Sequence, residues 1–282
     1  LDVGAQVPHC AVRAYVMGER CHDDAATPDE IAEMARVVRD GMRAGALGFS
    51  TSRTILHRER NGPLVPGTHC SGEELLALGG ALGEVGRGVF EMVSDLQGRE
   101  PDRSWMVEFA RKTGRPLIFA LAQNERDPNG LRAALADLLE LNRQGLAMKA
   151  MIPGRPVGLL LGLQSSLHPF LTHASFQSLR ERPLAEQVRE LRKPELRAAL
   201  LREEPGTDNP VLRMFLTNWT KQFRLGDPPD YEPRESESAA AIARANGKSP
   251  AEVMLDWMLE RDGRQLVYMP FAHYGGYDFE DL

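Results

Sequence analysis

Short apolar runs alternate with amphipathic segments over the first 165 residues of the chain. The amphipathic segments place leucines on one face, as helices do, and each ends near a glycine that can stop a helix in the left-handed conformation. The glycines are Gly45, Gly88, Gly114 and Gly145. The apolar runs are nearly continuous, which is typical of strands buried on both faces of a parallel sheet. The pattern predicts four βα units between residues 46 and 165, with residues 3–12 as the candidate for a preceding strand.

Three helix starts are marked by capping sequences. Residues 27–30 (TPDE) and 249–252 (SPAE) each place a hydroxyl side chain before a proline, with a glutamate at the third helical position. Residues 71–74 (SGEE) form a third capping-box pattern. We therefore expect helices to begin at these three places.

Two folds are built from repeated βα units, the open doubly wound sheet and the (β/α)8 barrel. No G-x-G-x-x-G follows a predicted strand, which removes the best evidence for the dinucleotide-binding open sheet. We predict an α/β protein that contains part of a (β/α)8 TIM-type barrel. A complete barrel takes about 250 residues, so this chain is expected to hold five or six of its strands.

The regular alternation is lost between residues 164 and 235. This segment contains a stretch with few helix formers, a charged helix that is expected to break at Pro194, and a proline-rich loop. We predict a helical and irregular excursion packed on the barrel, within one incomplete barrel domain that spans residues 1–282. Beyond the excursion we expect two helices and a strand, at residues 239–245, 250–260 and 265–269.

Composition and charge exclude several classes of partner. The chain is 42% hydrophobic and 26% charged, with a formal net charge of -6, which argues against binding to nucleic acid. No apolar run reaches the roughly 18 residues of a membrane span, so no membrane partner is expected. Three cysteines without a C-x-x-C pair favour a reducing, cytoplasmic setting. The polar segment described below leads us to expect a small-molecule substrate as the partner.

Both ends of the chain have the character of internal sequence. The chain begins at Leu1 in an apolar-rich stretch, and it stops in YDFEDL, which resembles the first turn of a helix. We therefore expect a fragment of a longer protein. As a fragment, the chain is expected to be inactive alone. It is also expected to be unstable, because an incomplete barrel leaves sheet edges unpaired.

A polar segment follows the apolar run that ends at Phe49. Ser50, Ser52 and Arg53 come directly after it, and His57 and Arg58 lie in the loop beyond. In a barrel, side chains at the carboxyl ends of strands surround the active site, and the planar fork of arginine suits a substrate carboxylate. The alternative is structural: the hydroxyls satisfy loop backbone groups, and Arg53 pairs with a carboxylate of the protein.

Four stretches of the sequence carry a family resemblance, which extends over essentially the whole chain. They are PHCAVRAYVMGER, GALGFSTSRTILHRERNGPLVPGT, EELLALGGAL and GRPVGLLLGLQSSLHPF. Together they resemble the D-aminoacylase branch of the amidohydrolase superfamily, which includes the N-acyl-D-amino-acid deacylases. The resemblance implies a metal-dependent barrel, a small β domain built from chain ends that are absent here, and hydrolysis of a C–N amide bond other than a peptide bond.

The resemblance also implies where a metal would be held. A Zn²⁺ ion lowers the pKa of bound water to about 7 and polarises the amide carbonyl. In the family, the first ligands would precede Leu1, and the aspartate that moves protons would follow Leu282. Two further histidines would fall at Val93 and Leu121, which cannot bind a metal. We therefore expect zinc or another divalent metal in the full-length protein, with ligands mostly outside this chain and none assigned within it.

Several polar residues lie close to the positions that the family uses. Asp95, Gln123 and Asn124 follow the strands that carry Val93 and Leu121, and they are candidates to orient substrate or to replace the lost ligands; the alternative is hydrogen bonding to loops. His9 matches a family stretch of the form GH..LR, which makes it another candidate site residue. The seven histidines show no H-x-H or H-E-x-x-H spacing.

Three hypotheses of function follow from these observations. The first is a metal-dependent amidohydrolase acting on an N-acyl amino acid or a related amide. The second is a barrel that has lost its metal ligands and binds a small molecule, such as a carboxylate or phosphate, or a partner. The third is a different barrel enzyme without metal, in which Arg53 and Arg58 hold a phosphate or carboxylate. Barrels host many chemistries, so the fold alone does not decide between them.

Overall fold

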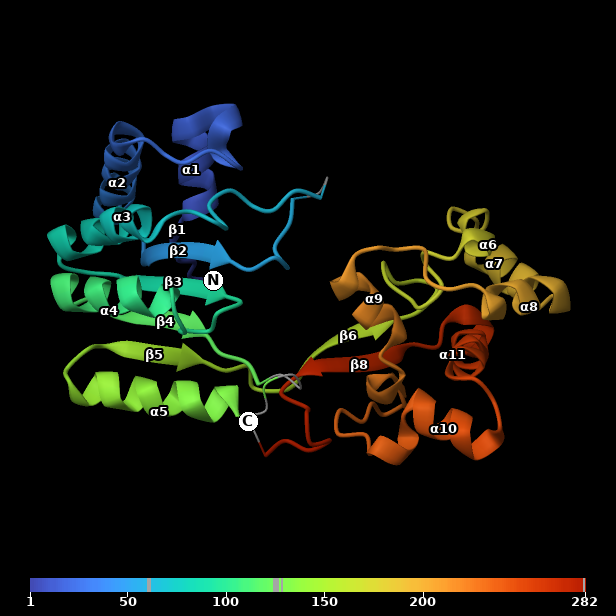
Figure 1. Cartoon of the computed structure of the whole chain (residues 1–282). Helices are drawn as coiled ribbons and strands as arrows, with labels where there is room; N and C mark the ends of the chain where they lie inside the picture. Colours follow the sequence, from blue (N-terminus) through green and yellow to red (C-terminus); the bar gives the residue numbers. More distant parts are fainter. Residues whose placement is uncertain (60–61, 124–126, 128, 281) are drawn as a thin grey trace. The chain divides into compact units, whose positions relative to one another are not determined.

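The structure is a computed structural model, and it describes residues 1–59, 62–123, 127, 129–280 and 282. The chain divides into two compact units. The first comprises Leu1–Ala122 and Asn129–Ile152, and the second consists mainly of Pro153–Leu282, joined by Gln123 (Figure 1).

The first unit is built on a parallel sheet with the strand order β1-β2-β3-β4-β5. Every neighbouring pair of strands is parallel. The strands are β1 (Val7–Pro8), β2 (Gly48–Arg53), β3 (Val89–Ser94), β4 (Leu117–Ala120) and β5 (Met148–Met151). All five strands therefore end at the same edge of the sheet (Figure 1). The order in space follows the order in sequence, which confirms the α/β class and three of the four predicted βα units. The fourth is wrong, because β5 is followed by a strand of a separate sheet (Val157–Leu161) and not by a helix.

The prediction for residues 3–12 is wrong beyond the two residues of β1. The chain turns into helix α1 (His9–Met17) directly after Pro8. The buried side chains of this helix include His9, Arg13 and Met17, which follow one another at intervals of four residues. That spacing is typical of a helix. The sequence pattern did not indicate a helix here, because two of these three buried residues are polar and were not counted as part of an apolar face.

The other helices of the first unit follow the sequence closely. They are α2 (Pro28–Arg43), α3 (Gly72–Val85), α4 (Asp102–Thr113) and α5 (Gly130–Arg143), together with the short 3-10 helix η1 (Gly18–Cys21). The capping box predicted at Thr27 is complete. At Ser71 only half of the box forms: the Ser71 hydroxyl accepts from the backbone N–H of Glu74, but the Glu74 carboxylate binds residues of α1 instead.

One face of the sheet packs on the helices and forms the core. Phe49 and Phe90 are neighbours in the β2–β3 register, with ring centroids 5.1 Å apart, and Phe109 of α4 lies 5.0 Å from Phe90. Side chains alternate along a strand, so Ser50 and Ser52 face the opposite side from Phe49 and Thr51. That second face is only partly buried, which corrects the expectation of burial on both faces.

The second unit has its own antiparallel sheet, with the order β6-β8-β7. The strands are β6 (Val157–Leu161), β7 (Phe223–Arg224) and β8 (Val267–Ala272). The α-helices are α6 (Ala174–Gln177), α7 (Leu184–Leu191), α8 (Pro194–Arg202), α9 (Pro210–Thr217), α10 (Ala239–Asn246) and α11 (Pro250–Met258). The 3-10 helices are η2 (Trp219–Lys221), η3 (Glu235–Glu237) and η4 (Glu260–Gly263).

The second unit bears out the local predictions for its sequence. The charged helix breaks before Pro194, which begins α8, and the capping box at Ser249 is complete. Residues 164–235 lie within this unit, together with α10, α11 and β8. The prediction of an excursion on a single incomplete barrel domain stays a prediction. None of the helices described here is long and apolar enough to cross a membrane.

Candidate active site

A cavity of about 360 Å³ opens on the partly buried face of the parallel sheet. All five strands run toward the same edge, and residues at or near the end of each strand line the cavity. Ser52 of β2 lies beside Val93 of β3 in the register. The lining consists of Gln6, Pro8, Cys10, Ser50, Thr51, Ser52, His57, Glu91, Met92, Val93, Ala120 and Met151. The volume falls in the range of small-molecule sites.

Three of the predicted site residues line this cavity: Ser50, Ser52 and His57. The Ser52 hydroxyl and the His57 Nδ1 form a hydrogen bond of 2.9 Å. A hydroxyl hydrogen-bonded to an imidazole can exchange a proton with it, and imidazole is the side chain whose ordinary pKa best suits that role near neutral pH. The cavity therefore contains a pair of groups that can bind a polar substrate and move a proton.

The sequence analysis missed Glu91, the carboxylate of the cavity wall. It lies opposite Ser50 in the β2–β3 register, and its Oε2 accepts a hydrogen bond of 2.6 Å from Gln6 Nε2. The available signal was a single charged residue inside an apolar run, two positions before Val93. Cys10, at the start of α1, is a second cavity residue outside the candidates predicted from the sequence.

Arg53 does not line the cavity. Its Nε donates to Asp102 Oδ1 at 2.8 Å, and one terminal nitrogen donates to the Cys70 carbonyl at 2.9 Å. Asp102 is fully buried at the start of α4, where it also accepts from Ser94 Oγ at 2.5 Å and from Trp105 Nε1 at 3.1 Å. Arg53 thus pairs with a carboxylate of the protein, as the structural alternative expected, on the helix-covered side of β2.

Other predicted site residues lie outside the cavity lining. Arg58 and Asp95 form hydrogen bonds within or between loops, and Gln123 lies in the second unit. Arg58 donates to the Gly62 carbonyl at 2.6 Å, within its own loop. Asp95 accepts from Thr54 Oγ1 at 2.6 Å and from the Ile55 N–H at 2.9 Å, which ties the loops after β3 and β2 together. Gln123 belongs to the second unit, where its carbonyl accepts from the His273 N–H at 3.0 Å. Asn124 lies outside the described residues.

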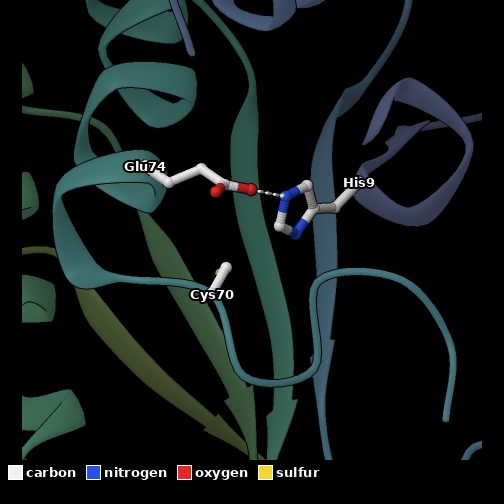
Figure 2. Close-up of side chains that lie close together, drawn as sticks. All are labelled: His9, Cys70 and Glu74. Carbon is white, nitrogen blue, oxygen red and sulfur yellow. Dashed lines mark hydrogen bonds and ion pairs between the residues drawn. The ribbon is translucent and has the colours of Figure 1, made fainter. Parts of the chain in front are cut away.

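His9 lies on the helix-covered side of the sheet, in a buried polar cluster. Its Nδ1 is 2.8 Å from Thr51 Oγ1, and its Nε2 is 2.8 Å from Glu74 Oε1 (Figure 2). Arg13 donates to both oxygens of Glu74, at 2.6 and 2.5 Å. Burial alone would raise the pKa of the Glu74 carboxyl, but the hydrogen bonds from His9 and Arg13 outweigh it and hold that pKa below its usual range.

The loop that leads into α3 is shaped around this cluster. Gly67 has a φ of +88°, and a Cβ added there would lie 2.6 Å from the His9 ring. Only glycine meets both requirements at this turn. Cys70 follows three residues later, and burial raises the pKa of its thiol to about 12. The thiol is therefore protonated at neutral pH in the protein alone.

The two positions at which the family resemblance implies histidine ligands, Val93 and Leu121, cannot bind a metal. Val93 presents hydrocarbon to the cavity, and Leu121 is a buried hydrocarbon side chain. In the described part of the chain, the cluster with three close metal-ligating atoms comprises His9, Cys70 and Glu74, on the other side of the sheet from Ser50 and Ser52. The cavity as described offers no preformed metal centre.

Comparison with known proteins gives the family. The profile described as the amidohydrolase family matches residues 1–270, so the chain belongs to that family. No curated protein matches the sequence.

Solved structures show a more distant similarity. An N-acyl-D-glutamate deacylase from Bordetella bronchiseptica, complexed with zinc and a phosphonate inhibitor, is 18% identical with a TM-score of 0.47; the match covers 96% of this chain and 44% of that one. A D-aminoacylase is 16% identical with a TM-score of 0.44, over 97% of this chain and 43% of that one. The chain thus spans less than half the length of these proteins.

Proposed function

We propose that the protein to which this chain belongs is a hydrolase that cleaves the C–N amide bond, other than a peptide bond, of an N-acyl amino acid or a related amide. The observation that carries the proposal is the match of the amidohydrolase family over residues 1–270. The cavity at the carboxyl ends of the parallel strands supports it, because barrel enzymes place their chemistry at that edge.

In this proposal, some cavity residues bind the substrate and His57 transfers a proton. The hydroxyls of Ser50 and Ser52 hydrogen-bond polar groups of the acyl amino acid, and the apolar walls at Val93, Ala120 and Met151 contact its hydrocarbon part. His57, hydrogen-bonded to Ser52, accepts or returns a proton at its ring nitrogen. A divalent metal, zinc or another, enters this proposal only through ligands outside residues 1–282, so no step is assigned to it.

A second candidate function is a ligand-depleted family member that binds a small carboxylate or phosphate without cleaving an amide. The hydrocarbon side chains at Val93 and Leu121 favour it, because these positions supply no metal ligand. The two candidates predict different results with the same substrates.

We also infer a reducing, cytoplasmic setting, because all three cysteines are free.

Amine release from N-acyl amino acids tests the proposed function. The full-length protein is incubated with N-formyl, N-acetyl and N-succinyl derivatives of several D- and L-amino acids, and the free amino acid is measured by fluorescamine and mass spectrometry. We expect turnover of at least one of these compounds, with the acid and the amino acid formed in equal amounts.

The same samples separate the two candidates. Saturable binding by calorimetry without amine release, in a protein in which elemental analysis finds no bound metal, would support the ligand-depleted alternative and contradict the hydrolase. Protein boiled before the assay is the control for uncatalysed hydrolysis.

A further inference from the structure

Three metal-ligating side chains from separate segments meet inside the first unit. His9 begins α1, Cys70 lies in the loop before α3, and Glu74 is in the first turn of α3. One nitrogen, one sulfur and one oxygen atom lie within 4.8 Å of one another, and all three groups are buried. Figure 2 shows the imidazole and the carboxylate facing each other, with Cys70 on the loop beside them.

We propose that His9, Cys70 and Glu74 form a binding site for a zinc-like divalent cation on the helix-covered side of the parallel sheet. The site is independent of the proposed hydrolysis and lies across the sheet from the face that carries Ser50 and Ser52. Its ligands would be His9 Nε2, Cys70 Sγ and Glu74 Oε1.

Two of the three ligands, His9 and Glu74, already have the outer partner that a metal site needs. His9 Nδ1 is hydrogen-bonded to Thr51 Oγ1 at 2.8 Å, which orients the ring, and Nε2 faces Glu74 Oε1 at 2.8 Å in a hydrogen bond that the cation would replace. Metal-binding histidines usually make such a bond with their second nitrogen, and metal-binding carboxylates are in turn hydrogen-bonded. Arg13 supplies that bond to Glu74, and its own Nε is fixed by the Cys21 carbonyl at 2.7 Å.

The ligand set selects the cation. A thiolate and an imidazole favour zinc and similar soft or borderline metals over magnesium and calcium, which prefer oxygen ligands. Around a tetrahedral zinc, ligand atoms 2.0–2.3 Å from the metal lie about 3.5 Å apart. His9 Nε2 and Glu74 Oε1, which are 2.8 Å apart, would therefore separate by roughly 0.7 Å, and Cys70 Sγ, within 4.8 Å of both groups, would adjust to the same spacing. Binding replaces the hydrogen bond between His9 Nε2 and Glu74 Oε1 with Zn–N and Zn–O bonds and forms a Zn–S bond. The thiol proton of Cys70 is released to solvent, and the imidazole proton passes from Nε2 to Nδ1, from which it is donated to Thr51 Oγ1. The fourth position is left for water.

The sulfur distinguishes a metal site from a purely structural cluster. Hydrogen bonding alone explains the contact between His9 and Glu74, because both are satisfied without a metal. Among the hydrogen bonds described, Cys70 Sγ has one, a weak N–H···S bond of 3.5 Å from Arg53, and its atom lies close to those of both His9 and Glu74. A cation between the three groups would give the sulfur a strong partner.

Cobalt(II) titration of the full-length protein tests the site. Metal is removed with a chelator, Co²⁺ is added, and the near-ultraviolet charge-transfer band of cobalt–thiolate bonds is recorded. We expect a band that is lost in Cys70→Ser and retained in the matched controls Cys10→Ser and Cys21→Ser. Thr51→Val should weaken cobalt binding about tenfold or more, because it removes the partner of His9 Nδ1.

A second measurement uses the unmutated protein, so it does not depend on the folding of a variant. One equivalent of zinc should slow the alkylation of Cys70 by N-ethylmaleimide at least about tenfold relative to chelator-treated protein, as mapped by mass spectrometry, and leave Cys10 unchanged. Equal alkylation rates of Cys70 with and without zinc, or a cobalt band of the same size in folded Cys70→Ser, would overturn the proposal. No substrate is present, so either outcome leaves the proposed hydrolysis to its own test.

Discussion

Replacement of His57 by glutamine in the full-length protein is expected to lower kcat/KM for an N-acyl amino acid by about 100-fold or more. His57 lines the cavity and is held 2.9 Å from the Ser52 hydroxyl. Glutamine keeps the ability to hydrogen-bond, but it cannot take up and return a proton near neutral pH. The loss should therefore fall mainly on kcat, which initial rates of amine release over a range of substrate concentrations would show.

The matched control for this experiment is His69→Gln. His69 lies in the same long loop region, but it is exposed and outside the cavity lining, so its replacement should leave kcat/KM within about twofold of the original. A His57→Gln protein that keeps full activity would remove His57 from the mechanism. Equal losses in both variants would point to a general disturbance of the loop.

Replacement of Glu74 by alanine is expected to lower the free energy of unfolding of the first unit by about 3–5 kcal/mol. Arg13 and Glu74 are each about 2% exposed, so the substitution leaves a buried guanidinium without its counter-charge. His9 Nε2 loses its partner in the same step. Urea unfolding followed by circular dichroism, with a chelator present to remove any metal contribution, measures the change.

Glu33→Ala is the matched control for Glu74→Ala. Glu33 is also a glutamate paired with an arginine, Arg36, but both side chains are exposed on α2. Solvent screens such a pair, so the control should unfold at the same urea concentration as the original protein within experimental error. If Glu74→Ala behaves like Glu33→Ala, the buried cluster is not a source of stability and the description of it here is wrong.

Local signals in the sequence predicted the helices and most of the parallel sheet. The caps at Thr27 and Ser249 form as expected, because both partners of a capping box lie within one turn. Glu74 departs from the same rule because Arg13 and His9 compete for its carboxylate from another helix. The contacts of Glu74 with His9 and Arg13 join residues more than 60 positions apart, so the local sequence pattern around Glu74 cannot predict them.

The candidate site was predicted in part, and the errors follow from strand geometry. Ser50 and Ser52 lie on one face of β2, whereas Thr51 and Arg53 lie on the other. The prediction treated Ser50, Ser52 and Arg53 as one site because they are close in sequence. Side chains along a strand point alternately to its two faces, so Arg53 lies on the opposite face from the serines. Glu91 shares its face with Ser50 through the β2–β3 register, which only the paired sheet reveals. The antiparallel pairing of β6 with β8 joins segments about a hundred residues apart, which single-sequence patterns do not specify.

The position of a bound substrate analogue tests the central claim most directly. A crystal structure of the full-length protein with a non-hydrolysable N-acyl amino acid analogue should show the analogue in the cavity of the first unit, hydrogen-bonded to Ser50 or Ser52 and within about 3 Å of the His57 ring. An analogue bound only elsewhere in the protein, with this cavity filled by solvent, would contradict the account.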